Sequence, residues 1–129
     1  MMRRRLVSSE ALETYAVDAE LAGKFDELLR SAERAEDALR QAQARGAPLA
    51  APRELGLAFD AALTAAMRAA YAAERVEIGV RGYDDWIYRR KAKAKAKVRT
   101  WRDEAERLLT MREVHRLTGI PRVPPSLAS

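Results

Sequence analysis

Cysteine is absent from this chain of 129 residues, and histidine occurs only once, at His115. Without cysteine there are no disulfides and no thiolate ligands for a structural zinc ion. The absence fits a reducing cytoplasm, which is the location we expect. No window approaches eighteen uninterrupted apolar residues, and the basic start MMRRRLVSSE lacks the apolar core of a signal peptide. We therefore expect neither a membrane span nor secretion.

Signatures of catalysis are equally scarce. A serine hydrolase would have to use His115 as its base, and a lone histidine late in a helix is usually a hydrogen-bonded surface residue. No Glu-x-x-His flanks it, so a di-iron site is unsupported. The glycines of Gly79-x-x-Gly82 have neither a Walker lysine nor the dinucleotide fingerprint. We expect no enzymatic activity, no cofactor and no metal site.

Large apolar side chains are few, because 26 of the 62 apolar residues are alanine. Alanine favours helices and lets them approach closely, but it buries little area. With five prolines and 33% charged residues, this composition predicts an all-α protein with slender helix contacts. Part of the apolar surface of the protein would then be buried by a partner or by self-association.

A first helix is predicted over residues 9–45 of a single helical domain, 8–118. Ser8 or Ser9 is a good N-cap, and Gly46 followed by Pro48 is typical of a helix end. Within it, apolar residues alternate spacings of four and three, as in a coiled coil: Leu21, Phe25, Leu28, Ala32, Ala35, Leu39 and Ala42. A helix this long must lie along another long helix.

A second helix is predicted over 52–77, with Pro52 in its first position, and a third over 84–109, capped by Asp84 or Asp85. The first two would form an antiparallel hairpin. An apolar arc on the third would complete an elongated antiparallel three-helix bundle: Ile87, Ala94, Val98, Trp101, Ala105 and Leu108. Outside the bundle we expect a basic N-terminal extension, 1–7, and an extended, proline-rich tail, 119–129.

The region around Thr110 allows two interpretations. Thr110 and Glu113 form a capping-box pattern, so a short fourth helix, 110–118, would begin there. Alternatively one long helix changes packing partner at this point. TMREVHRLTGIPRVPPSL also resembles the first half of the helix-turn-helix of LacI-type and IclR-type repressors. The resemblance covers about twelve residues, and Pro124 and Pro125 depart from it by interrupting the would-be recognition helix.

The net charge of +5 is unevenly distributed along the chain. Residues 8–46 carry five basic and nine acidic side chains, whereas 81–102 carry nine basic and two acidic. The densest basic run lies in the predicted third helix and consists of Arg89, Arg90, Lys91, Lys93, Lys95, Lys97, Arg99 and Arg102. On a continuous helix these would flank the apolar arc as two rails. Like charges repel at such spacings, and no acid lies within the run.

Such a run indicates contact with nucleic-acid phosphates, without reading of bases, assisted by Arg3 to Arg5. Tyr88 and Trp101 would add stacking. The alternatives are a solvated face and a structural or scaffolding subunit of an oligomeric assembly, in which acidic and basic helices pair between chains. A degenerate helix-turn-helix regulator is a third hypothesis. The cluster of Tyr83, Trp86 and Tyr88 is either core packing or a binding surface.

Overall fold

The computed structural model describes residues 7–119, which are helical nearly throughout and contain no strand. Five α-helices are joined by short turns, including a 3₁₀ turn at Val80–Tyr83, and a π-helical turn follows at His115–Gly119. The helices are α1 (Ser9–Gly23), α2 (Phe25–Ala44), α3 (Ala50–Ile78), α4 (Trp86–Ala92) and α5 (Ala96–Val114). The all-α prediction is confirmed. Within the described residues, no helix has the length and apolarity needed to cross a membrane.

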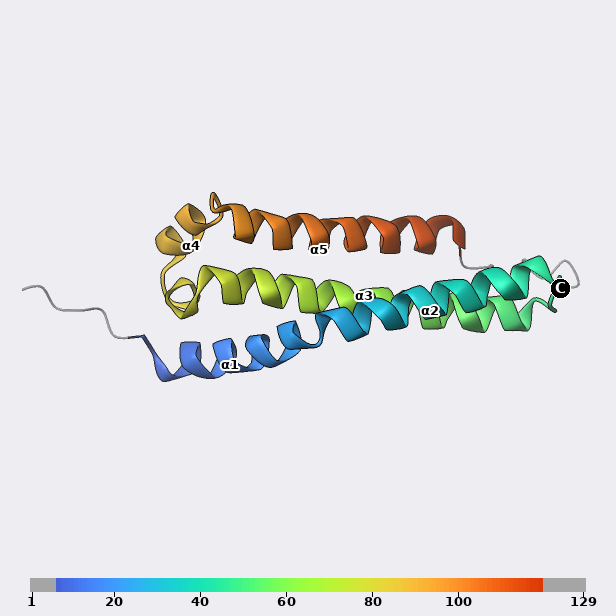
Figure 1. The fold of residues 1–129 in the computed structure, drawn as a ribbon, viewed down its shortest axis with the longest axis horizontal. Helices are drawn as coiled ribbons and strands as arrows, with labels where there is room; N and C mark the ends of the chain where they lie inside the picture. Colours follow the sequence, from blue (N-terminus) through green and yellow to red (C-terminus); the bar gives the residue numbers. More distant parts are fainter. Residues whose placement is uncertain (1–6, 120–129) are drawn as a thin grey trace, which may run out of the picture.

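The long helix α3 is the centre of the molecule (Figure 1). It packs against α5 on one side and against α2 and α1 on the other. Helices α2 and α3 run antiparallel, and the whole is elongated. The helices pack together as expected, but these contacts do not establish the coiled-coil-like three-helix bundle, which stays a prediction.

Alanine dominates the core, as its abundance predicts. Four alanines of α3 are completely buried, Ala66, Ala69, Ala70 and Ala72. The only larger side chains buried to a similar extent among the described residues are Leu63, Val98 and Leu108. Because alanine adds little volume, neighbouring helices approach α3 closely and each contact buries little apolar area.

The ends of the first hairpin follow the predicted signals. The Ser8 hydroxyl accepts a hydrogen bond from the Ala11 amide at 3.0 Å and so caps α1. Gly46 has a φ of 65°, and the amides of Gly46 and Ala47 donate to the carbonyls of Gln43 and Ala42. This Schellman motif closes α2, and glycine is favoured there because the backbone is left-handed.

The prediction of one helix over 9–45 is wrong, because the helix is interrupted at Lys24. The Lys24 amide bonds to the carbonyl of Leu21 at 3.0 Å, a tighter turn than an α-helix makes. Gly23 precedes this turn and is a weak helix former. The break lets α1 lie against the far end of α3, where its Asp18 meets Arg75. The following helix, predicted from Pro52, begins at Ala50.

The single helix predicted over 84–109 is also wrong. It consists of α4, capped by Asp85 as predicted, and α5, with a turn at residues 93–95 between them. Ala94 and Ile87 are therefore exposed rather than part of one apolar arc. In α5 itself the arc is right, since Val98, Ala105 and Leu108 are buried. The two rails of charge do not exist in the predicted form.

At Thr110 the helix does not break, because α5 continues to Val114, as the second interpretation predicts. The predicted change of packing partner is not seen, since Arg112 and His115 still contact α3. The short fourth helix predicted over 110–118 is replaced by the end of α5 and the π-helical turn. The N-terminal residues 1–6, with Arg3 to Arg5, lie outside the described part of the chain. So do residues 120–129, which include most of the predicted tail and of the helix-turn-helix resemblance.

Candidate nucleic-acid interface

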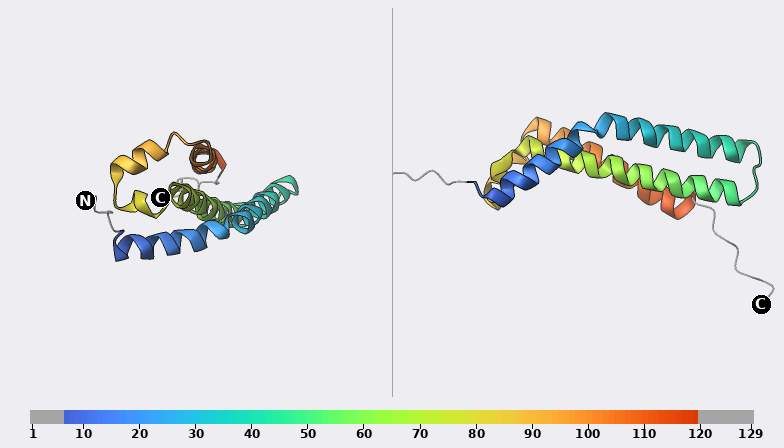
Figure 2. Two further views of the ribbon diagram at one scale, coloured as in Figure 1. Left: turned by 60° about the vertical axis from the view of Figure 1, so that its left-hand side comes forward. Right: turned by 90° about the horizontal axis from the view of Figure 1, so that it is seen from below.

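The eight predicted cations gather at one end of the molecule, where α4 folds over the end of α3 and turns into α5 (Figures 1 and 2). We call the residues 89–102 the basic corner. Arg89, Arg90 and Lys91 lie in the last turn of α4, and Lys93 and Lys95 in the turn between the helices. Lys97, Arg99 and Arg102 belong to α5. The structure thus brings all eight together, but around a bend rather than along one helix.

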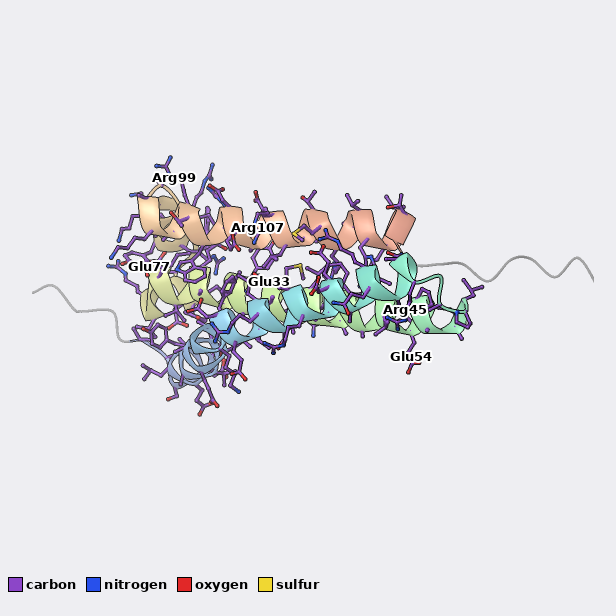
Figure 3. All side chains as sticks on the ribbon, turned by 45° about the vertical axis from the view of Figure 1, so that its right-hand side comes forward. Glu33, Arg45, Glu54, Glu77, Arg99 and Arg107 are labelled. Atoms are coloured by element: carbon purple, nitrogen blue, oxygen red, sulfur yellow. The ribbon has the colours of Figure 1, made fainter. Side chains whose placement is uncertain are left out.

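The side chains of the basic corner face solvent. Seven of the eight are exposed, and Arg102 is half-buried. Arg99 points away from the other helices (Figure 3). Arg89 also donates from Nη1 to the carbonyl of Gly82 at 3.1 Å, which holds α4 against the preceding turn. The corner therefore presents exposed positive charge at one end of the molecule.

None of these eight cations forms a salt bridge within residues 7–119. Seven cations elsewhere in the described chain do: Lys24, Arg40, Arg75, Arg81, Arg107, Arg112 and Arg116. Most of the acidic side chains of α1 and α2 are exposed, and these two helices lie on the other side of α3 from α5 (Figure 1). Within the described residues, the charge of the corner is thus not balanced by ion pairs.

The start of α5 adds to the positive potential. Lys95 precedes its first turn, no side chain caps its free amides, and no acidic residue lies in that turn. A helix N-terminus carries a partial positive charge, so lysine there is unfavourable unless an anion is near. At the end of α4 the same charges are favourable, because Arg89, Arg90 and Lys91 lie at its negative pole.

A small apolar cluster holds the corner in place. Ile78 at the end of α3, Ala92 of α4 and Val98 of α5 are buried together, and Tyr88 packs against them. The guanidinium of Arg81 lies 4.7 Å from the centre of the Tyr88 ring, a cation–π contact. The bend is consequently a packed element, and the positions of its charges are fixed by neighbouring helices.

One carboxylate lies beneath the corner. Glu74 of α3 is buried, and its Oε2 has no hydrogen-bond partner within the described residues. Burial raises its pKa above the ordinary value of 4.5, and the charges of Lys93 and Arg102 lower it in part. Glu74 is thus an internal counter-charge to the corner, although it is not in a salt bridge with either cation.

A polar network anchors α1 at the same end of α3. The buried carboxylate of Asp18 accepts hydrogen bonds from Arg75 Nε at 2.8 Å and from the Tyr83 hydroxyl at 2.5 Å. Burial alone would raise the pKa of Asp18, but these bonds and the guanidinium charge outweigh it and hold the pKa below 3.8. Ser8 adds a second link, since its amide and hydroxyl donate to Asp84.

The aromatic residues divide between packing and exposure. Trp101 was predicted to stack on bases. Its ring lies edge-on against Phe25 with 5.2 Å between ring centres and is half-buried, so it packs against the core instead. Tyr83 and Tyr88 are half-buried and held by the contacts above. Trp86 is 60% exposed at the first position of α4. It lies one turn from Arg89 and Arg90, so it is the aromatic residue of this end that is free to stack.

His115 is not the surface residue that its position predicts. It is buried, its Nε2 lies 2.7 Å from the Gly56 carbonyl, and its ring packs edge-on against Phe59. It therefore fixes the end of α5 to α3. Across residues 7–119 no group of three or more His, Cys, Asp or Glu side chains is placed to hold a metal ion.

Comparison with known proteins gives no relative from which a function could be transferred. No protein-family model matches the chain, and neither a curated protein nor a solved structure shows significant similarity to it.

Proposed function

We propose that this protein is a non-enzymatic helical binding protein that contacts nucleic-acid phosphates through Arg89, Arg90, Lys91, Lys93, Lys95, Lys97, Arg99 and Arg102. The observation that carries the proposal is the contrast in pairing within residues 7–119: seven of the twelve other cations have carboxylate partners, and none of these eight does. Unpaired cations this close together repel one another, and a polyanion relieves that repulsion by releasing its counterions.

The geometry favours the backbone over the bases as the bound group. Seven of the eight cations of the corner are exposed, and lysine and arginine side chains reach phosphates without entering a groove. Trp86 supplies one exposed ring for stacking, which suits single strands or ends more than the interior of a duplex. We propose sequence-independent binding and an unpaired strand as the better ligand. A reducing cytoplasm is a compatible location.

The test is binding of fluorescein-labelled single-stranded DNA, followed by anisotropy at low salt. In the test variant Lys91, Lys93, Lys95 and Lys97 are changed to glutamine, and we expect affinity to fall at least tenfold. The matched control removes four exposed arginines from α2 and α3 by the same change: Arg30, Arg34, Arg53 and Arg68.

Both variants lose four charges, so a general effect of net charge weakens them equally. Local binding at the corner weakens only the first. Equal losses, or an unchanged affinity of the lysine variant, would refute the proposal.

A second candidate function is a structural subunit whose acidic and basic surfaces pair between copies. The observation in its favour is that α1 and α2, which contain nine of the 19 acidic residues and are net negative, lie across α3 from the basic corner. These charges do not reach each other within one chain, but they can between two. The predicted coiled-coil packing and oligomeric state belong to this hypothesis.

Light scattering separates the two candidates. Pairing between chains predicts a mass that rises with concentration at low salt and returns to 14.5 kDa as salt is added. A chain that stays monomeric at low salt and high concentration would exclude the structural candidate, while leaving nucleic-acid binding to be judged by the anisotropy experiment.

A further inference from the structure

The outward side of α1 combines apolar and acidic side chains. The inward side contains the buried Ala11 and Asp18, and Tyr15 on it lies edge-on against Tyr83. On the opposite side, five exposed residues fall within an arc of about 140°: Leu12, Glu13, Ala16, Val17 and Glu20. We call these five residues the acidic face. Glu13 forms no ion pair within residues 7–119, and the only one of Glu20 there is a long, exposed contact with Lys24 at 3.9 Å.

The outward side of α4 has the complementary pattern. Its inward side contains the buried Ala92, and the half-buried Tyr88 packs there as well. The exposed residues of the helix outside this contact again fall within an arc of about 140°: Trp86, Ile87, Arg90 and Lys91. We call these four residues the basic face. Each of the two faces thus carries two charges of one sign beside exposed apolar side chains.

Exposed apolar side chains are concentrated on these two faces. Eight large apolar side chains are exposed in residues 7–119, and four of them lie here: Leu12, Val17, Trp86 and Ile87. Yet α1 and α4, with 15 and 7 residues, make up only about a fifth of the described chain. Exposed apolar side chains that gather with charged ones are typical of an interaction surface.

Both faces lie at the same end of the molecule and are held firmly. Helices α1 and α4 lie on either side of the end of α3 (Figures 1 and 2), and both pack on the 3₁₀ turn between them. The amide and hydroxyl of Ser8, which caps α1, donate to the Asp84 carboxylate at 2.8 and 2.9 Å. Because the faces are positioned before a partner arrives, binding orders little of the chain.

We propose that two copies of this chain form a dimer in which the acidic face of each copy lies on the basic face of the other. The proposal rests on the second candidate function, pairing between copies, and names the surfaces that pair. Because both faces lie at one end, a two-fold axis beside that end lets the contact form twice in one dimer. In each contact the carboxylates lie against Arg90 and Lys91, and apolar side chains cover Trp86, a residue type enriched at interface hot spots.

The faces are small, so the dimer is weak. A stable interface buries about 1,200–2,000 Å², which two short helix faces approach only because the contact is made twice. Its charged pairs are exposed, so salt dissociates the dimer. The contact also covers Trp86, Arg90 and Lys91, so a second copy and an unpaired strand compete for this part of the basic corner.

Reversal of the charges on one face at a time tests the proposal by sedimentation velocity at low salt. One variant carries Glu13→Arg and Glu20→Arg, and the other carries Arg90→Glu and Lys91→Glu. Each alone should dimerise at least about tenfold more weakly than the parent, because like charges then oppose each other in both contacts. Mixed together, they should form a 1:1 dimer of twice the 14.5 kDa chain mass, because both contacts then join opposite charges. One chain with all four changes should dimerise as the parent does.

Matched controls reverse two exposed charges away from both faces: Glu27→Arg with Asp37→Arg, and Arg53→Glu with Arg68→Glu. Each has the net charge of one face variant but should keep the dimer. Circular dichroism checks that all variants keep the helix content of the parent. Equal losses in controls and face variants, or no dimer in the mixture and in the chain with four changes, would overturn these faces while pairing between copies stands. A parent that is monomeric at low salt would remove both, and a mass beyond a dimer would overturn the two-fold arrangement.

Discussion

At the scale of single residues, the two buried carboxylates of this chain behave in opposite ways. Asp18 has two hydrogen-bond donors and a cation, and its pKa is lowered although it is buried. Glu74 has an oxygen without a hydrogen-bond partner among residues 7–119, and its pKa is raised by burial. Burial alone therefore does not decide the charge state; the number of donors that reach the carboxylate does.

Asp18→Asn should destabilise the fold at neutral pH. The folded pKa of Asp18 lies below its unfolded value, so the carboxylate contributes stability above about pH 5, and this is lost as the pH falls through the folded pKa. The Arg75 side chain is 45% exposed, which screens the pair, so we expect a loss of about 1–2 kcal/mol. Urea unfolding at several pH values measures it, and the difference between variant and parent should shrink below pH 4. A difference that persists at low pH would mean that the charge is not responsible.

Glu74→Gln should have the opposite sign. Because the folded pKa of Glu74 is raised, its ionisation opposes folding at a pH above the unfolded value and has no effect below it. We expect the amide to stabilise the protein by about 1 kcal/mol at pH 7 and to give no gain at pH 4. It should also tighten nucleic-acid binding, since a negative charge beneath the basic corner is removed. Lower stability at pH 7 would show that attraction to Lys93 and Arg102 exceeds the cost of burial.

At the scale of elements, helices begin or end at the predicted capping residues. Two of the predicted helices are interrupted at positions where the sequence has no strong helix-ending signal. Ser8, Gly46 and Asp85 act as their types and positions suggest. The break at residues 93–95 could not be foreseen, because alternating alanine and lysine favour a helix locally, and the break at Lys24 has only the weak signal of Gly23. At both breaks the chain direction depends on tertiary contacts. The Asp18–Arg75 pair holds α1 against α3, and the burial of Ala92 with Val98 places α4 and α5 on either side of a turn.

The candidate site was therefore predictable in composition but not in shape. The eight cations are local in sequence, so their density and exposure follow from the sequence itself. Their arrangement around a corner depends on Ile78, which is distant in the chain. The same reason explains Trp101 and His115, whose burial depends on Phe25 and Gly56, contacts between helices that no local pattern reports.

Two glycine substitutions test the packing at the end of α1 and in the turn before α4. A Cβ on Gly23 would meet nothing within 4 Å, so Gly23→Ala should stabilise the protein by about 0.5–1 kcal/mol through helix propensity. A Cβ on Gly82 would lie 2.5 Å from Cγ2 of the buried Ile78, so Gly82→Ala should cost about 1–3 kcal/mol. Thermal unfolding followed by circular dichroism compares them. Gly82→Ala unfolding at the same temperature as the parent would show that the turn before α4 is not packed as described.

At the scale of the whole molecule, charge is separated along and across an elongated body. The basic corner occupies one end, and the acidic helices α1 and α2 lie across α3 from it. A polyanion can therefore bind the corner without approaching the acidic surface. Binding at one end also limits how many phosphates a single molecule can neutralise.

That limit gives a quantitative prediction for salt dependence on duplex DNA. Because the eight cations surround a bend, they cannot all face one duplex, and we expect about five contacts and a slope of log K against log salt of about −4.5. Each lysine that contacts a phosphate contributes about −0.9 to it. Between one and four of the five contacts are made by lysine, so the variant with Lys91, Lys93, Lys95 and Lys97 changed to glutamine should give a slope between about −3.6 and about −0.9, whereas the control without Arg30, Arg34, Arg53 and Arg68 keeps the parent slope. Fluorescence titrations between 50 and 200 mM salt, about the range in which such slopes are resolved, measure all three. Equal slopes for the two variants would place the phosphate contacts outside the basic corner, because the variants differ only in where four charges were removed.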